Sequence, residues 1–173
     1  MNDEARTVDN TATQLERSCR SIAKKLEAIV NGSSVRDSNG DILNRAEIDT
    51  FLSDLEPEER EGFEEYCAEQ AYEQDDLSDE EAVDVMVDVF DAERVDIGDY
   101  FEDALDVMYT CNAQKEFIGV RVAVAIGGSY IYIDTDRSAV LGYWGSDRAE
   151  FYFERDVRVA INGYFKNIFD CLS

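Results

Sequence analysis

Helical periodicity extends over most of the first 109 residues of the chain. Apolar residues recur there at steps of three and four positions, which places them on one face of an α-helix. The first amphipathic segment runs from about residue 11 to residue 30 and ends at Asn31-Gly32, a pair typical of a helix C-terminus. Further helices are predicted to begin at Asn44, Pro57, Ser78 and Asp96, the last of them running to Tyr109.

Two of these helices begin with a capping box, in which a polar side chain and a glutamate three residues later cap each other's backbone N–H groups. Asn44 with Glu47 has this form, and so does Ser78 with Glu81. The helix that starts at Pro57 is expected to point Phe63, Cys67 and Ala71 inward, because these residues lie four positions apart.

Between the first two helices, the segment Val35–Leu43 has no helical period. Ser38-Asn39-Gly40 lies at its centre, so a small hairpin or loop is the simplest interpretation. An EF-hand calcium loop is the alternative. It is disfavoured because carboxylates would be needed at the positions of Val35 and Ala46.

From Phe117 onward the pattern changes to the alternation of a β-strand. Val120, Val122, Val124 and Ile126 share one face, and Gly127-Gly128 then supplies a turn. A phosphate-binding loop is disfavoured here because neither a helix nor a lysine follows the glycines. Three more strands and a closing helix are predicted, at about 130–133, 139–144, 149–153 and 155–171.

These patterns together predict an α+β fold. About five N-terminal helices precede a three- or four-stranded antiparallel β-meander, which packs against the C-terminal helix. We expect residues 1–110 to be helical and strongly acidic from residue 41, and residues 111–173 to hold the sheet and the last helix. The two parts are expected to form one compact unit.

The chain is strongly acidic, and its acidic residues are unevenly distributed. The 173 residues include 40 acidic and 16 basic side chains, for a net charge of −24. Residues 41–110 contain 26 of the acids and only 3 bases, whereas salt adaptation would spread acids over the whole surface. Nucleic acid and anionic membranes would repel such a chain, so we expect a basic nucleic-acid-binding protein as its partner and no direct contact with nucleic acid or membrane.

Several kinds of chemistry are excluded by composition. Without histidine there is no Cys/His zinc site, no histidine base and no Ser-His-Asp triad. The four cysteines form no CxxC pair and are interpreted as buried free thiols rather than disulfides. No apolar run reaches about 18 residues and no signal peptide is apparent, which predicts a cytoplasmic protein. We predict no enzyme activity, catalytic residue, metal or cofactor.

The acidic block is the candidate binding site. Carboxylates three or four positions apart on a helix lie about 5–6 Å apart, close to the spacing of phosphates along a strand. A net charge of −23 matches roughly 39 Å of duplex, which makes DNA mimicry the leading hypothesis. A solvated acidic surface and catalytic carboxylates are the alternatives. The candidate partner-binding residues are Glu61, Glu65, Glu69, Asp75, Asp76, Asp79, Glu80, Glu81, Asp84, Asp88, Asp91, Asp99, Glu102, Asp103 and Asp106.

The strand-turn-strand segment of residues 120–135, VRVAVAIGGSYIYIDT, is followed by Leu141-Gly142-Tyr143-Trp144. Together they resemble a module of small acidic anti-defence proteins, which are anti-CRISPR and antirestriction factors of phages and conjugative elements. The turn in those proteins usually reads Gly-Gly-Pro-Asn, and Ser129-Tyr130 replaces its second half here. The resemblance covers about residues 105–170.

The resemblance implies an anti-defence role in a bacterial cell, encoded by a phage or mobile element, and several proteins of this kind are acidic DNA mimics. It implies no catalytic residues. The expected function is inhibition of a bacterial nuclease, with a Cas9-type effector as first choice. The alternatives are an antirestriction protein against a restriction-modification enzyme, or an acidic interaction module that inhibits nothing.

Overall fold

The computed structural model describes the backbone of residues 3–172 and the side chains of residues 11–172. Within these residues there are six helices and two antiparallel sheets, which confirms the α+β class. The chain divides into two compact units. We call Ala28–Asp96 the acidic unit, and Met1–Glu27 together with Ile97–Ser173 the sheet unit. None of the described helices is long and apolar enough to span a membrane.

Three helices build the core of the acidic unit: α2 (Arg45–Ser53), α3 (Pro57–Gln70) and α4 (Asp79–Phe90). The predicted capping boxes at Asn44 and Ser78 are confirmed, since each side chain accepts from the backbone N–H three residues on and the matching glutamate returns a contact. The helices bury one apolar stripe each, and their cluster includes Ile48, Phe63 and Met86.

A small sheet accompanies these helices, with strand order β2-β1-β3. Its strands are β1 (Val35–Arg36), β2 (Ile42–Leu43) and β3 (Glu93–Arg94). The hairpin expected between Val35 and Leu43 is therefore confirmed. Its turn is held by the carboxylate of Asp37, which accepts hydrogen bonds from the backbone N–H groups of Asn39 and Asp41.

The sheet unit contains a five-stranded antiparallel meander in which every strand pairs with its neighbour in sequence. The strands are β4 (Asp106–Cys111), β5 (Phe117–Ala125), β6 (Tyr130–Asp134), β7 (Ala139–Trp144) and β8 (Asp147–Tyr152). Asp134 is buried at the end of β6, where Arg121 of β5 donates two hydrogen bonds to it, at 2.5 and 2.9 Å.

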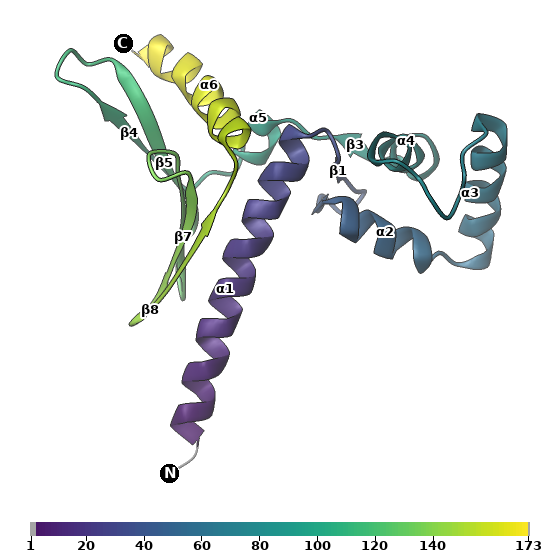
Figure 1. Ribbon diagram of the computed structural model, residues 1–173, viewed down its shortest axis with the longest axis horizontal. Coiled ribbons are helices and arrows are strands. Elements are labelled where there is room, and N and C mark those ends of the chain that lie inside the picture. The colour runs from purple at the N-terminus through teal and green to yellow at the C-terminus, as the bar shows by residue number, and fades with distance from the viewer. Residues whose placement is uncertain (1–2, 173) are drawn as a thin grey trace. The chain divides into compact units, whose positions relative to one another are not determined.

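Two helices lie on one face of this sheet: α6 (Arg155–Leu172) and α1 (Asp3–Val30), the latter with its residues up to Glu27 (Figure 1). A Cβ at Gly142 would meet Leu15 of α1 at 2.8 Å, so α1 approaches the backbone of β7 closely. Tyr109 of β4 and Phe169 of α6 have ring centroids 5.4 Å apart. The opposite face carries Tyr130, which is 45% exposed, opposite Tyr143.

The helix predicted from Asp96 to Tyr109 is wrong. Only α5 (Ile97–Tyr100) is helical, and the chain then enters β4, which makes the sheet five strands rather than three or four. The physical reason is pairing: Val107 lies opposite Val122, and Tyr109 lies opposite Val120. Side chains that shared a helical face in the sequence instead alternate across a sheet, and tertiary contacts override the local period.

Two smaller expectations also differ. Ala71 is exposed rather than inward because it ends α3 in the left-handed conformation, with φ at 60°. Ile126 is 52% exposed because the register shifts between Ala123 and Ala125, before the predicted face ends. By its contacts, α1 up to Glu27 belongs to the sheet unit, and Ala28–Asp96 forms a unit of its own.

Candidate functional site

The predicted carboxylates divide between the two units. Eleven of them, from Glu61 to Asp91, lie in the acidic unit on α3, on α4 and between them. The other four lie in the sheet unit: Asp99 on α5, Glu102 and Asp103 in the turn after it, and Asp106 at the start of β4. The structure therefore does not bring all fifteen residues together on one element or in one unit.

The outer side of α3 carries the clearest part of the candidate site. Glu61, Glu65 and Glu69 are exposed and follow each other at four-residue steps, while Phe63 and Cys67 are buried on the other side. At a rise of about 1.5 Å per residue, successive carboxylates of the stripe are roughly 6 Å apart along the helix. None of the three has a hydrogen-bond or ion-pair partner among the described residues. We call these three residues the α3 stripe.

Carboxylates of α4 contact other side chains of the acidic unit. Glu81 and Asp84 are half-buried rather than directed outward, and Asp84 pairs with Arg94 and accepts a 3.3 Å hydrogen bond from the hydroxyl of Tyr72. Asp88 is exposed, and it accepts a 2.6 Å hydrogen bond from the hydroxyl of Tyr66. Since Tyr66 lies on α3 and Tyr72 just after it, these contacts fasten α3 to α4.

The electrostatics of these contacts follow from their geometry. The hydrogen bond to Asp88 raises the pKa of Tyr66, and partial burial raises it further. Partial burial also raises the pKa of Tyr72, with Asp84 adding to the effect. Hydrogen bonds from Ser78 lower the pKa of Glu81, since they stabilise its charged form. These acids therefore contribute to the fold, whether or not they also contact a partner.

The remaining carboxylates of the acidic unit surround the end of α3 and both ends of α4. Asp75 and Asp76 are exposed in the segment between the two helices, and Glu80 is exposed in the first turn of α4. Asp79 pairs with Arg45 at 3.1 Å. Asp91 ends α4 in the left-handed conformation and is exposed.

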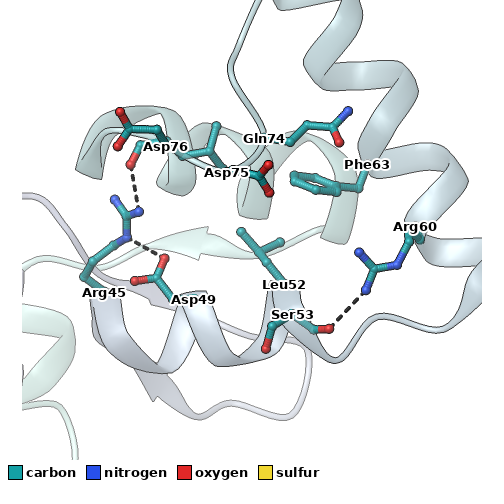
Figure 2. Close-up of a pocket in the computed structure, with 10 residues that line it drawn as sticks. Arg45, Asp49, Leu52, Ser53, Arg60, Phe63, Gln74, Asp75 and Asp76 are labelled. Carbon is teal, nitrogen blue, oxygen red and sulfur yellow. Dashed lines mark hydrogen bonds and ion pairs between the residues drawn. The ribbon is translucent and has the colours of Figure 1, made fainter.

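A cavity of about 500 Å³ lies between α2, α3 and the segment that links α3 to α4 (Figure 2). Arg45 is fixed at one side, where its guanidinium contacts Asp49 at 2.8 Å and donates to the carbonyl of Leu77 at 2.7 Å. Arg60 donates to the carbonyl of Ser53 at 3.0 Å. The residues that line the cavity are Arg45, Asp49, Leu52, Ser53, Arg60, Phe63, Gln74, Asp75, Asp76 and Leu77.

Three of the four arginines of the acidic unit form contacts away from the α3 stripe. The acidic unit contains 23 acids and 4 arginines, a net charge of −19. Arg45 and Arg60 hold the cavity wall and Arg94 holds Asp84. Sequence reasoning missed these residues, although the four-residue step from Arg45 to Asp49 was a visible signal of an ion pair.

The cysteines are free thiols, as expected, but only two of them are buried. Burial raises the pKa of Cys19 to about 11, which makes this thiol unreactive. Cys67 is buried in the acidic unit, whereas Cys111 and Cys171 are exposed, contrary to expectation. Among the described residues, no group of three or more Cys, Asp and Glu side chains is arranged to hold a metal ion.

Comparison with known proteins found no matching family model, curated protein or solved structure. The functional conclusion therefore rests on the charges and contacts of the chain itself.

Proposed function

We propose that this protein inhibits a bacterial nuclease defence system by placing the acidic unit in a basic groove that normally holds nucleic acid. The α3 stripe is the observation that carries the proposal. Three exposed carboxylates without partners, in a unit of net charge −19, offer a basic groove the charge that a phosphate backbone would offer.

Folding alone does not favour such a stripe. Like charges four positions apart on a helix destabilise it by about 0.2–0.5 kcal/mol per pair. Glu61, Glu65 and Glu69 form two such pairs and gain no compensating contact among the described residues. Contact with cations of a partner would remove this repulsion. Binding therefore accounts for a feature that stability opposes.

The target that we favour is a Cas9-type effector, whose guide and target strands lie in a positively charged channel. A restriction-modification enzyme is the second choice. In both cases the inhibitor acts by occupancy and not as an enzyme. The protein would lie in the cytoplasm of a bacterium and be encoded by a phage or mobile element.

Charge removal on the α3 stripe tests the proposal. The triple variant Glu61→Gln, Glu65→Gln and Glu69→Gln keeps side-chain length and should leave helix α3 intact. Exposed ion pairs contribute about 0.2–1 kcal/mol each, so the variant should bind a Cas9–guide complex roughly 3- to 150-fold more weakly. Binding is measured by titration at about 0.1 M salt, with circular dichroism to confirm the fold.

The matched control removes three exposed acids of the sheet unit, through Glu16→Gln, Glu154→Gln and Asp156→Asn. It has the same net charge as the test variant. Equal weakening by the two variants would show that only total charge matters and would reject a localised interface. A wild-type protein that binds neither a Cas9–guide complex nor a restriction enzyme would favour the alternative of a non-inhibitory acidic module.

A further inference from the structure

A second cavity, of about 470 Å³, lies within the sheet unit between α6 and the end of the sheet where β5 begins and β6 ends. It is distinct from the acidic surface discussed above. Its lining residues are Ile118, Thr135, Asp136, Arg158, Val159 and Asn162.

The α6 wall of this cavity holds two polar groups that lack partners. Arg158 is half-buried, and its guanidinium makes no ion pair or hydrogen bond with the described residues, in a chain with 40 acids. Asn162 lies one helical turn further, and its Oδ1 atom is buried without a hydrogen-bond donor among the described residues. The buried Oδ1 atom costs free energy because it has no donor, and the unpaired guanidinium of Arg158 at the cavity is available to an anion.

The opposite wall is fixed by contacts within the sheet. Asp136 accepts a 2.9 Å hydrogen bond from the hydroxyl of Thr110, and a Cβ at position 119 would overlap its carboxylate, so only Gly119 leaves room for it. The hydroxyl of Thr135 accepts from the N–H of Val120 at 2.8 Å and donates to its carbonyl at 3.1 Å. The carboxylate of Asp136 is therefore held in place at the cavity without an ion pair to Arg158.

Two aliphatic side chains complete the rim. Ile118 of β5 is 51% exposed and Val159 of α6 is 56% exposed. Each lines the cavity, one from the sheet and one from the helix. The site thus combines one cation, one anion and an apolar rim.

We propose that this cavity binds a free aliphatic α-amino acid. Its carboxylate pairs with Arg158, its ammonium group donates to Asp136, and its side chain lies between Ile118 and Val159. The opposite charges of the zwitterion match the opposite charges of the two walls. Asp136 selects a free amino acid over a peptide C-terminus, in which the same nitrogen is an uncharged amide.

The experiment is an isothermal titration of the full chain with leucine, N-acetyl-leucine and leucinamide. Leucine carries both charges, N-acetyl-leucine only the carboxylate and leucinamide only the ammonium group. We expect leucine to bind roughly tenfold or more tightly than either analogue. Absence of leucine binding to the wild-type chain, or equal binding of leucine and N-acetyl-leucine, would overturn the proposal.

Three variants locate the site. Arg158→Gln and Asp136→Asn should each weaken leucine binding roughly tenfold or more, while a thermal melt confirms that the variant is folded. Arg155→Gln, on the same helix but outside the cavity, should change the affinity less than about twofold. Equal effects of Arg155→Gln and Arg158→Gln would place binding elsewhere. No nuclease takes part, so the outcome is independent of the proposed inhibition.

Discussion

At the residue scale, the acids of this protein divide into those that hold the fold and those that do not. Asp84 and Asp88 accept hydrogen bonds from tyrosines of the neighbouring helical segment, whereas the side chains of Glu61 and Glu65 form no hydrogen bond or ion pair with a described residue. The helical spacing had predicted all four as partner-binding residues on the outer sides of their helices. A stripe assignment depends only on spacing, and spacing does not reveal a tyrosine that reaches over from another helix.

The pair formed by Tyr66 and Asp88 has a measurable effect on stability. Tyr66→Phe removes a 2.6 Å hydrogen bond and should lower the free energy of unfolding by about 0.5–1.5 kcal/mol. Because this contact raises the pKa of Tyr66 above its ordinary value of 10.0, its contribution is fully present below pH 10 and declines as the pH rises further. Urea denaturation at pH 7 and above pH 10 measures both effects.

Tyr152→Phe is the control, because Tyr152 is 69% exposed. It should change the free energy of unfolding by less than about 0.5 kcal/mol at either pH. If Tyr66→Phe is as mild as this control, then the hydrogen bond to Asp88 contributes nothing to stability and both groups are available to a partner.

At the element scale, the structure differs from the sequence pattern at β4, which is a strand where a helix was predicted. Leu105 and Met108 lie in the segment that the sequence pattern predicted to be an amphipathic helix, yet they are 57% and 43% exposed. Val107 pairs with Val122 on the sheet face that α1 and α6 cover. Glutamate at Leu105 should therefore cost less than about 0.5 kcal/mol, whereas glutamate at Val107 should cost about 1–3 kcal/mol. Urea denaturation of the variants Leu105→Glu and Val107→Glu measures the two losses in the free energy of unfolding. A larger loss for Leu105→Glu than for Val107→Glu would support the predicted helix instead of strand β4.

The elements that could be predicted from the sequence are those encoded by a few neighbouring residues. The capping boxes at Asn44 and Ser78, the hairpin after Val35 and the turns between β5 and β8 could be predicted because each is encoded within a few positions. β4 could not, since its strand state depends on pairing with β5. The cavity between Arg158 and Asp136 was equally hidden, because its walls come from elements 22 residues apart in sequence. Side-chain spacing carries no information about such encounters.

At the scale of the whole molecule, charge is distributed by unit. The acidic unit carries a net charge of −19 and the sheet unit −5, with 17 acids and 12 bases. Under our two proposals the units would bind different ligands, the first a basic groove and the second a small zwitterion in a cavity with one arginine and one aspartate. Loss of one function need not remove the other.

Inhibition by occupancy makes a prediction that an enzyme does not share. If the acidic unit replaces nucleic acid in a basic groove, inhibition of a Cas9–guide complex should reach completion near one equivalent, and added DNA should compete with it. It should weaken between about 0.1 and 0.5 M salt, because salt screens exposed charges. The measurement is a titration at several DNA concentrations, followed by recovery of the nuclease and determination of its mass and activity. Full inhibition far below one equivalent, with a cleaved or modified nuclease, would show catalysis instead. Inhibition that changes with neither DNA concentration nor salt would indicate that the target binds a surface of the sheet unit and not the α3 stripe.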